Sequence, residues 1–417
     1  MRAAWVAVFI AVTFAVAAAP SSGDTPLPPG FVVTPYAETE VVATSLAFGR
    51  DTREGAEPGV KRLYVTDFTN GAVVVIDDMT GVGSRAEVFA EGFRNPLGVV
   101  ANAKGTLFVA DAEANRPGPF GPRVYGRVWR VRDTDGDGVA DKQKVVIKDL
   151  PNGRHNTNGM AFGPDGMLYV TNGNSTDDGV EGGQAEVVPW SGSLIRVNPR
   201  WTNMSLGDLS VKQALVATGW RNVYDVAFSP LDRSKVFVPM NGTDDARQGS
   251  TGENPADPNL EDSDDLLYVT DIDDSRIDDF GFPSCLYNLA EKGNLKPYQN
   301  PNPEVIKLFG RCPVRTVPRP ISSFGLHPSA NGLAFQRTDS WGDAFRNDLF
   351  VAEWGSLFGS PSGHKVVRVE LNDAGTKVVD QSDFFESDLP LDVTFDRAGA
   401  LYVANFSGTI FKIDQVP

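Results

Sequence analysis

The sequence has few cysteines and too few basic residues to balance its acids. Of its 417 residues, 38 are lysine or arginine and 54 are aspartate or glutamate, so the formal net charge at pH 7 is -16. A surface of this sign repels phosphate backbones and anionic lipids, which argues against nucleic acid as a partner. Beyond the N-terminus, no apolar run approaches the ~20 residues that a membrane-spanning helix needs. We therefore expect no nucleic-acid partner and no membrane span in the mature chain.

The two cysteines, Cys285 and Cys312, lie far apart in the sequence, and neither belongs to a Cys-x-x-Cys unit. This spacing gives little support to a metal site built on the pair. In an oxidising compartment, an even pair within one irregular segment is best explained as a single disulfide. Two buried thiols are the alternative.

The N-terminus has the composition of a secretory signal peptide over residues 1–19. Arg2 supplies a positive start, residues 3–16 form an apolar run, and residues 17–19 are the small residues of a cleavage pattern. An uncleaved membrane anchor is the alternative, but the run is short for a bilayer and no stop-transfer charges follow it. We expect a mature chain that starts near Pro20 and is secreted, either to the extracellular space or to the periplasm.

Most of the remaining chain follows one repeat. A short strand ending in Ala-Phe, or a related pair, is followed by a Gly/Asp turn and a strand of the Leu-Tyr-Val-Thr-Asp type. The first strands of the six copies end at Phe48, Ala101, Phe162, Phe228, Phe335 and Phe395. Several copies continue with two further strand-like runs, and four strands per repeat is the pattern of a propeller blade. The 42 glycines and 29 prolines also favour many short strands, because both residues break helix interiors.

The sixth copy is one strand short after residues 409–413, whereas residues 31–36 form a strand without a repeat. We predict that this N-terminal strand completes the last blade and removes an exposed sheet edge. A seventh blade is the alternative, because residues 266–271 also read Leu-Leu-Tyr-Val-Thr-Asp, although they have no inner-strand partner. A solenoid or a β-sandwich would not repeat the Ala-Phe signature in this way. The expected fold is all-β: a single six-bladed β-propeller domain over residues 20–417, with an insertion around 284–325.

Loop type assigns many polar residues to one face of such a disc. In an up-and-down blade, the turns between strands one and two and between strands three and four lie on one side, and the other connections lie on the opposite side. Those other connections carry Arg154, His155, Asn158, Asn172, Asn174, Arg221, Asn222, Tyr224, residues 241–245, Asn331, Glu353 and Trp354. Such a polar cluster around a central pit is typical of a small-molecule site.

Each of these residues also has a structural explanation. For His155 the alternative is an ordinary structural histidine. The polar, glycine-flanked run at 153–159 argues against this alternative, because it does not suit apolar core filling. For Arg221 the alternative is an inter-blade salt bridge. His327 and His364 have no comparable setting, and we expect them at the surface.

Residues 133–141 have the acidic spacing of a calcium loop. Positions 1, 3, 5 and 9 are carboxylates and position 7 offers its backbone, which gives the candidate ligands Asp133, Asp135, Asp137, Val139 and Asp141. Ca²⁺ takes six to eight oxygen ligands, and alternate acids supply them within one tight turn. The twelfth-position glutamate of an EF-hand is missing, so the loop resembles the shorter dockerin or thrombospondin type. A solvated acidic turn is the alternative. The loop should lie on the face opposite His155, so we expect a structural ion.

Several longer motifs together resemble a known family, the soluble quinoprotein sugar dehydrogenases of the glucose/sorbosone dehydrogenase group, which includes pyranose dehydrogenase propellers. The motifs are GRHNTNGMAFGPDG at 153–166, GWRN at 219–222 with DVAF at 225–228, residues 132–141, GFP at 281–283 with Cys285, and VAEWGS at 351–356. The resemblance covers nearly all of the mature chain. It implies that pyrroloquinoline quinone (PQQ) lies over the pit, takes a hydride from a sugar and passes electrons to an external acceptor.

The resemblance also implies roles for single residues. His155 would act as general base on the sugar hydroxyl, and Arg221 would stabilise negative charge at the quinone. Asn222, Asn158 and Trp354 occupy positions at the cofactor. The backbone carbonyls of Gly242 and Thr243 would hold a second Ca²⁺ that polarises the quinone.

Two positions depart from the family pattern. Leu391 stands where many relatives have an arginine that pairs with a cofactor carboxylate, and Trp354 stands where they often have a histidine. A tricarboxylate binds more weakly among fewer cations, unless Arg154, Lys365 or a loop of the 285–312 segment compensates. We expect a secreted sugar-oxidising enzyme. The alternative is a non-enzymatic extracellular propeller that binds a glycan or another ligand in the same pit.

Overall fold

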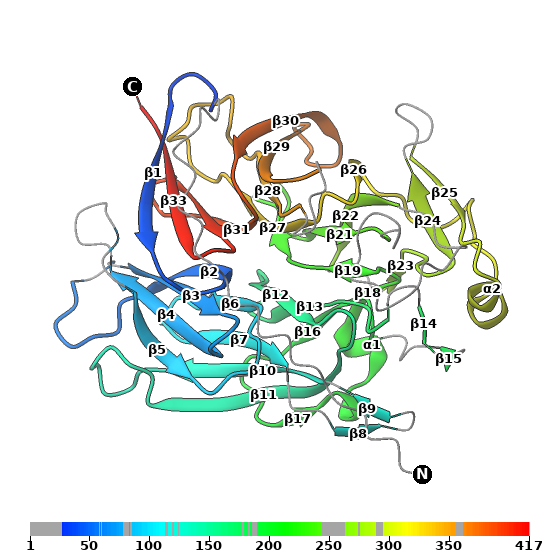
Figure 1. Cartoon of the computed structure of the whole chain (residues 1–417), viewed down its shortest axis with the longest axis horizontal. Helices are drawn as coiled ribbons and strands as arrows, with labels where there is room; N and C mark the ends of the chain where they lie inside the picture. The colour runs from blue at the N-terminus through cyan, green and yellow to red at the C-terminus, as the bar shows by residue number, and fades with distance from the viewer. Residues whose placement is uncertain are drawn as a thin grey trace, which may run out of the picture.

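Six β-sheets surround one axis and form a six-bladed β-propeller (Figure 1). The computed structural model describes residues 27–57, 59, 61–77, 83, 86–112, 116–118, 121–123, 125–176, 179–181, 184–185, 190–243, 263–273, 276–288, 295–355 and 362–416. The predicted signal peptide lies outside these residues, as do positions 244 and 245 of the predicted site.

Each blade is an antiparallel sheet whose first strand is innermost. Blade one consists of β2 (Ala43–Arg50), β3 (Lys61–Asp67), β4 (Ala72–Asp77) and β5 (Glu87–Glu91). Blade two consists of β6 (Gly98–Ala101), β7 (Leu107–Ala112), β10 (Tyr125–Arg132) and β11 (Lys142–Pro151). Blade three consists of β12 (Thr157–Phe162), β13 (Leu168–Asn172), β16 (Ser193–Val197) and β18 (Leu215–Thr218). Short parallel strands extend the outer edges of the second and third blades, namely β17 (Met204–Ser205) and β23 (Asp278–Asp279).

The last three blades follow the same plan. Blade four begins with β19 (Asn222–Val223) and β20 (Ala227–Phe228), which both pair with β21 (Lys235–Asn241), and continues with β22 (Asp264–Asp271) and β26 (Ser322–Leu326). Blade five consists of β27 (Ala330–Phe335), β28 (Leu349–Glu353), β29 (Lys365–Leu371) and β30 (Val378–Glu386). Blade six consists of β31 (Pro390–Phe395), β32 (Leu401–Asn405), β33 (Thr409–Gln415) and β1 (Phe31–Glu38).

The ring closes through the N-terminal strand, as predicted. Strand β1 pairs antiparallel with β33, from Phe31 opposite Gln415 to Glu38 opposite Thr409. Residues 266–271 belong to β22, the third strand of blade four, where they pair with β21 and β26. The repeat-like sequence of this strand therefore adds no seventh blade.

The second strands of the blades are the most completely buried. All five residues of β13 and of β32 are buried, because neighbouring blades cover both faces of each strand. Aromatic rings meet edge-on across the blade contacts, with the rings of Tyr169 and Phe228 centred 5.1 Å apart and those of Phe237 and Phe335 also 5.1 Å apart. The Ala-Phe repeat thus supplies the packing between blades.

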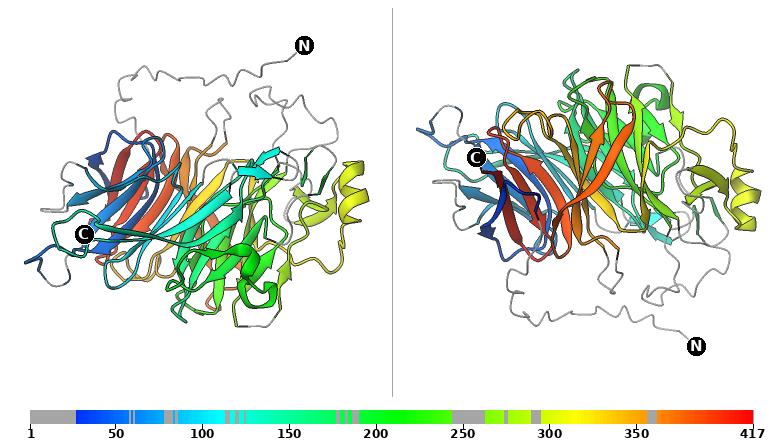
Figure 2. Two further views of the ribbon diagram at one scale, coloured as in Figure 1. Left: turned by 90° about the horizontal axis from the view of Figure 1, so that it is seen from below. Right: turned by 90° about the horizontal axis from the view of Figure 1, so that it is seen from above.

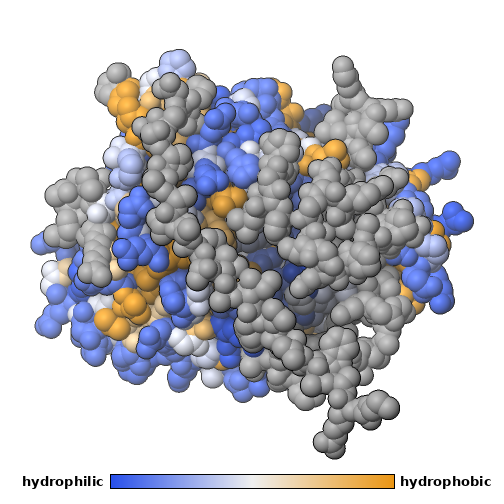
Figure 3. Space-filling model, in the orientation of Figure 1, coloured by the Kyte–Doolittle hydropathy of each residue, from blue (hydrophilic) through white to orange (hydrophobic). Residues whose placement is uncertain are grey.

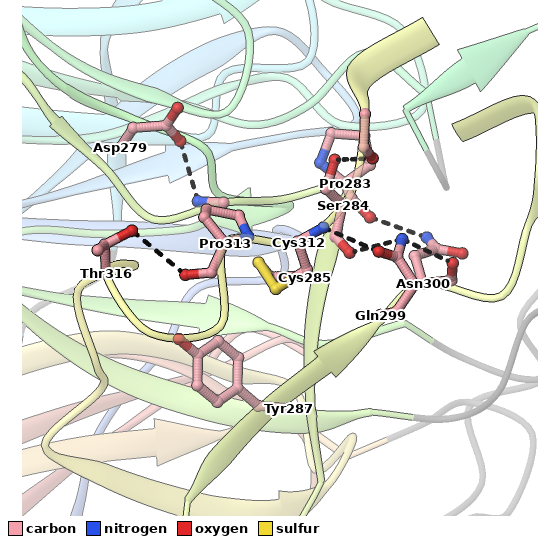
Figure 4. The surroundings of a disulfide bond; sticks show 12 residues. Asp279, Pro283, Ser284, Cys285, Tyr287, Gln299, Asn300, Cys312, Pro313 and Thr316 are labelled. Atoms are coloured by element: carbon pink, nitrogen blue, oxygen red, sulfur yellow. Dashed lines mark hydrogen bonds between the residues drawn. A yellow bond between two sulfur atoms is a disulfide. The ribbon is translucent and has the colours of Figure 1, made fainter. Parts of the chain in front are cut away.

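An insertion projects from the disc edge beside blades three and four (Figure 2). It contains β24 (Cys285–Asn288) paired with β25 (Lys296–Gln299), and helix α2 (Pro303–Phe309). The predicted disulfide between Cys285 and Cys312 is present, with a Cα–Cα distance of 4.9 Å (Figure 4). Asn302 caps α2 by accepting a hydrogen bond from the backbone N–H of Glu304.

Few other elements interrupt the strands. They are the hairpins β8 (Arg116–Gly118) with β9 (Gly121–Arg123) and β14 (Val180–Glu181) with β15 (Gln184–Ala185), the 3₁₀ turn η1 (Leu206–Asp208) and helix α1 (Val211–Ala214). Within the described part of the chain, no helix has the length and apolarity needed to span a membrane. Hydrophilic residues predominate on the face shown in Figure 3, in keeping with the acidic composition.

Candidate active site

The polar crossover residues meet at one end of the central channel, which we call the upper mouth. It comprises His155, Asn174, Arg221, Asn222 and Asn241, from blades three and four and the crossovers that precede them. The opposite end, where the inner strands finish in Ala-Phe pairs, is the lower mouth.

A backbone carbonyl fixes the imidazole of His155. The half-buried ring places Nδ1 2.8 Å from the carbonyl oxygen of Asn174. A carbonyl only accepts hydrogen bonds, so Nδ1 carries a proton, and in the neutral ring the lone pair therefore lies on Nε2. This is the tautomer that a general base needs.

Gly173 lets His155 and Asn222 approach each other. A Cβ added to Gly173 would lie 2.5 Å from the Cβ of His155 and 2.6 Å from Oδ1 of Asn222. Any side chain here would push the two residues apart. The close approach explains why glycine follows β13 at this point.

Asn222 lies in a chain of amide hydrogen bonds. Its Oδ1 accepts from Nδ2 of Asn158 at 3.0 Å, and its Nδ2 donates to Oδ1 of Asn241 at 2.7 Å. Nδ2 of Asn241 donates in turn to the carbonyl of Ala330 at 2.7 Å. These bonds fix the orientation of the amides and link the inner strands of blades three, four and five.

Arg221 is a buried cation at the same mouth, with 2% of its surface exposed. Its Nη1 donates to the carbonyl of Gly242 at 2.6 Å, and its backbone carbonyl accepts from the N–H of Asn174 at 2.6 Å. Asn174 therefore contacts both the imidazole of His155 and the backbone of Arg221. The structure places the two predicted catalytic residues on either side of Asn174.

The carbonyls predicted to bind a second Ca²⁺ already have protein partners. The carbonyl of Gly242 accepts from the Arg221 guanidinium, and that of Thr243 accepts from the N–H of Ser263 at 3.0 Å. A positive charge against the first carbonyl opposes a divalent cation there. As they lie in this structure, these atoms do not fit the predicted second calcium site.

Across the mouth lies an acidic group that sequence reasoning missed. Asp265 is fully buried and accepts from the N–H groups of Gly242 and Ala330, both at 2.7 Å. Nδ1 of His327 lies 3.2 Å from Oδ1 of Asp265, and the imidazole is half-buried. The expectation that His327 is a surface residue was wrong, because the crossover into blade five places it over the third strand of blade four.

His364, also expected at the surface, is half-buried too. Its Nδ1 lies 3.7 Å from a carboxylate oxygen of Asp388, and its ring packs against Gly355. The glycine again allows the close contact, since an added Cβ would lie 2.5 Å from Nε2 of His364. This second expectation was therefore also wrong.

The end of β28 contains polar atoms without hydrogen-bond partners. Glu353 is buried, and its Oε2 forms no hydrogen bond with the described residues and lies 3.8 Å from Nζ of Lys365. Burial raises the pKa of Glu353 to about 8, although the charge of Lys365 works against that rise. Nε1 of Trp354 is likewise buried and has no partner among the described residues. Such orphaned groups are uncommon and indicate a place for a ligand or water.

Leu391, where the resemblance predicts an arginine, has a buried side chain. Lys365 is already engaged, because its Nζ lies 2.7 Å from a carboxylate oxygen of Asp383 as well as near Glu353. Arg154 is exposed, and its backbone N–H donates to the carbonyl of Ser175. Arg221 and Arg154 are the cations of the described upper mouth, and Arg311 of the 285–312 segment lines the cavity beside it.

A cavity of about 560 Å³ opens beside the upper mouth, between blade three and the insertion. Its lining includes Asn174, Thr218, Asp279, Phe282 and Arg311. It lies next to His155 through their shared neighbour Asn174. No local sequence pattern predicts this cavity, because its walls come from segments far apart in the chain.

The predicted calcium loop connects β10 and β11 at the lower side of blade two. Ligand oxygens of Asp133, Asp135 and Asp141 lie within 4.8 Å of one another. Asp137 instead accepts from the N–H of Val139, and the Val139 side chain is exposed. Hydrogen bonds from Thr134 lower the pKa of Asp141 to about 2, which keeps it ionised. Three of the predicted carboxylates are therefore gathered.

Comparisons with known proteins agree with this fold. The family model of a domain of unknown function, DUF7133, matches residues 50–224. No curated protein matches the sequence.

Among solved structures, the chain is similar to a calcium structure of a Trichoderma reesei protein of carbohydrate-active enzyme family AA12. The TM-score is 0.69 and the sequence identity is 15%, and the match covers 94% of this chain and 97% of that one. It is also similar to the PQQ domain of pyranose dehydrogenase from Coprinopsis cinerea in its holo form, with a TM-score of 0.64, 13% identity, and coverage of 94% and 98%.

A third similar structure is the PQQ-bound aldose sugar dehydrogenase of Streptomyces coelicolor, with a TM-score of 0.58, 18% identity, and coverage of 93% of this chain and 99% of that one. At these identities the likeness establishes a shared propeller fold. Function has to be argued from the residues of the upper mouth.

Proposed function

We propose that this chain is a secreted quinoprotein oxidoreductase that oxidises a sugar, of the aldose, sorbosone or pyranose type, and passes the electrons to an external acceptor. The observation that carries the proposal is the position of His155. Its proton-bearing Nδ1 is anchored on Asn174, and Asn222 lies directly across Gly173.

The residues of the upper mouth fit an anionic, flat cofactor such as PQQ. Arg221 and Arg154 supply positive charge, and Asn222 and Asn158 supply oriented amides. Nε1 of Trp354, which has no partner among the residues that the structure describes, would supply a hydrogen-bond donor for a carboxylate or carbonyl oxygen. When bound, PQQ would supply the two-electron acceptor for the hydride that leaves the sugar carbon.

His155 is the group that would move the proton. A sugar hydroxyl within reach of Nε2 transfers its proton to that nitrogen as the hydride leaves the adjacent carbon, so the carbon is oxidised by two electrons. The carbonyl of Asn174 then stabilises the imidazolium through its hydrogen bond to Nδ1–H. The fixed charge of Arg221 favours negative charge that develops nearby.

The cavity between blade three and the insertion is the proposed space for the sugar. It borders Asn174, and its lining mixes Thr218 and Asp279 with the ring of Phe282. Hydroxyl-binding polar groups beside an aromatic surface suit a carbohydrate. The disulfide holds the insertion wall in place, and we propose that it forms after export.

The proposed structural ion occupies the loop at 133–141, away from the chemistry. We also propose that residues 1–19 are removed and that residues 20–417 form one propeller domain. Intact-mass measurement of the secreted protein tests the cleavage, with a mature N-terminus near Pro20 as the expected result.

The function is tested by reconstituting purified protein with PQQ and Ca²⁺ and following dye reduction across a panel of sugars. His155→Ala and His155→Gln should retain cofactor binding and lose turnover by roughly 10²–10⁴-fold, because each lacks the base. Gln retains a donor for the Asn174 carbonyl and so separates loss of the base from loss of the contact. Uptake of PQQ without oxidation of any sugar would favour the non-enzymatic ligand-binding propeller.

A further inference from the structure

The lower mouth of the central channel contains a cavity that the proposed chemistry does not use. The inner strands β12, β20, β27 and β31 end there, because the last residue of each lines the cavity. The cavity has a volume of about 320 Å³. This volume is at the small end of the roughly 300–1,000 Å³ usual for ligand pockets.

Phenylalanines of the Ala-Phe repeat line this cavity. They are Phe162, Phe228, Phe335 and Phe395, from blades three to six. Phe162 and Phe395 are partly exposed, whereas the other two are buried. The wall therefore offers an apolar surface to the body of a small ligand.

Two arginines from adjacent blades border the same cavity. Arg233 lies in the turn before β21, and Arg337 lies in the turn after β27. Nη2 of Arg337 donates to the carbonyl of Phe228 at 2.8 Å, which holds the guanidinium over the neighbouring blade. Neither arginine forms an ion pair with the described residues.

The two guanidinium groups act on each other. Burial lowers the pKa of Arg337, and the positive charge of Arg233 lowers it further. Asp396 is the carboxylate of the lining, but its Oδ1 accepts from the N–H groups of Gly399 and Ala400 within its own turn. In a chain of net charge -16, two neighbouring cations over an apolar wall are well suited to an anion.

We propose that the lower mouth binds a small organic anion. Its carboxylate or phosphate group lies between Arg233 and Arg337, and its apolar body contacts the phenylalanines. Guanidinium groups match the geometry of both anionic groups. The site is separate from the proposed sugar oxidation, because the four steps along β12 from Asn158 to Phe162 place about 13 Å between the mouths at ~3.3 Å per residue.

Calorimetric titration of the intact protein at low ionic strength tests the proposal. The probes are phenyl phosphate and benzoate, with benzyl alcohol as the neutral analogue. We expect at least one of the two anions to bind with 1:1 stoichiometry and the alcohol to bind at least tenfold more weakly. Comparison of phenyl phosphate with benzoate identifies which anionic group the site prefers.

The matched variants are Arg233→Gln, Arg233→Lys and Arg200→Gln. The side chain of Arg233 forms no hydrogen bond or ion pair with the residues that the structure describes, so its replacement should leave the fold intact. Anion binding should weaken at least fivefold. Lys should restore part of the affinity. Arg200 lies in an exposed turn after β16 on the same side of the disc, and its replacement should change nothing.

Three outcomes would overturn the proposal. They are the absence of binding of both anions at 10 mM, equal binding of benzyl alcohol, and equal affinity in Arg233→Gln and wild type. Sugar oxidation should be unchanged in Arg233→Gln, so failure of this site and failure of the proposed function are distinguishable.

Discussion

The two mouths of the central channel are formed by the same inner strands and differ in chemistry. At the upper mouth, crossovers deliver Asn, Arg and His side chains that hydrogen-bond from blade to blade. At the lower mouth, the strands end in the repeated Ala-Phe pair, and the turns that follow carry Arg233, Arg337 and Asp396. The Ala-Phe pairs that pack the blades therefore occupy one end of each inner strand, and the polar residues of the candidate active site lie at the other end.

Two carboxylates, the half-buried Asp225 and the buried Asp392, lie between the two mouths. Asp225 precedes β20 and accepts from the N–H of Leu333 at 3.3 Å, and Asp392 in β31 accepts from the N–H of Leu46 at 2.8 Å. Burial raises the pKa of both groups, that of Asp392 to about 7, and the negative charge of Asp392 raises that of Asp225 further. They tie blade four to blade five and blade six to blade one, so their role is architectural.

Because the upper mouth carries the proposed catalytic residues, we expect substitutions there to alter activity more than stability. Gly173→Ala forces His155 and Asn222 apart, and a displacement of about 1 Å in an active site costs on the order of 100-fold in turnover. The measurement is dye-coupled turnover of PQQ-loaded protein. The matched control is Gly207→Ala, because a Cβ there meets only one atom, at 3.8 Å. Equal activity of the two variants would contradict the proposed contact.

Trp354→Phe should weaken PQQ binding by roughly tenfold, because it removes one hydrogen-bond donor and keeps most of the ring. Its T-shaped contact with Phe406 should persist, so the melting temperature should stay nearly constant. Cofactor affinity is measured by fluorescence titration. An unchanged affinity would show that the indole N–H does not face the cofactor.

The calcium loop should behave in the opposite way, since it affects stability and not chemistry. Saturating Ca²⁺ should raise the melting temperature of the wild type by a few degrees, as binding at 100 Kd adds about 2.7 kcal/mol. Asp135→Ala should lose most of this increase and retain cofactor uptake. Thermal melts with and without a chelator provide the measurement, and identical calcium responses in the two proteins would argue against the ion.

The smallest expected effect concerns pH and the carboxylates between the mouths. The folded-state pKa of Asp392 lies above its ordinary value of 3.8, so its contribution to stability is complete below about pH 4 and is lost as the pH rises through 7. Melting temperatures at pH 5 and pH 8 should therefore differ less in Asp392→Asn than in the wild type. The exposed Asp380→Asn should keep the wild-type difference. A variant curve as steep as that of the wild type would exclude this assignment.

The fold could be predicted from the sequence because each copy of the repeat corresponds to one blade of the propeller. The Ala-Phe pairs mark the inner strands, and the surplus N-terminal strand at 31–36 complements the incomplete sixth copy. The same strand periodicity assigned His155 and Arg221 to one face. These predictions needed only local patterns and the geometry of an up-and-down blade.

The remaining features depend on contacts between distant segments. Asp265 meets His327 across 62 positions of the chain, and no local motif marks either residue. The engagement of the Gly242 carbonyl by Arg221 likewise depends on packing between β21 and the crossover into blade four. Such pairings arise when the ring closes, so the sequence pattern alone could not place them.

The most direct measurement is the equilibrium binding of PQQ to purified wild-type protein and to the Arg221→Gln variant, under conditions in which both proteins are fully folded. The account predicts one quinone per chain at micromolar concentration and at least a tenfold loss of affinity when the buried guanidinium is removed. If the wild type takes up no quinone under these conditions, the upper mouth is not the redox site proposed here.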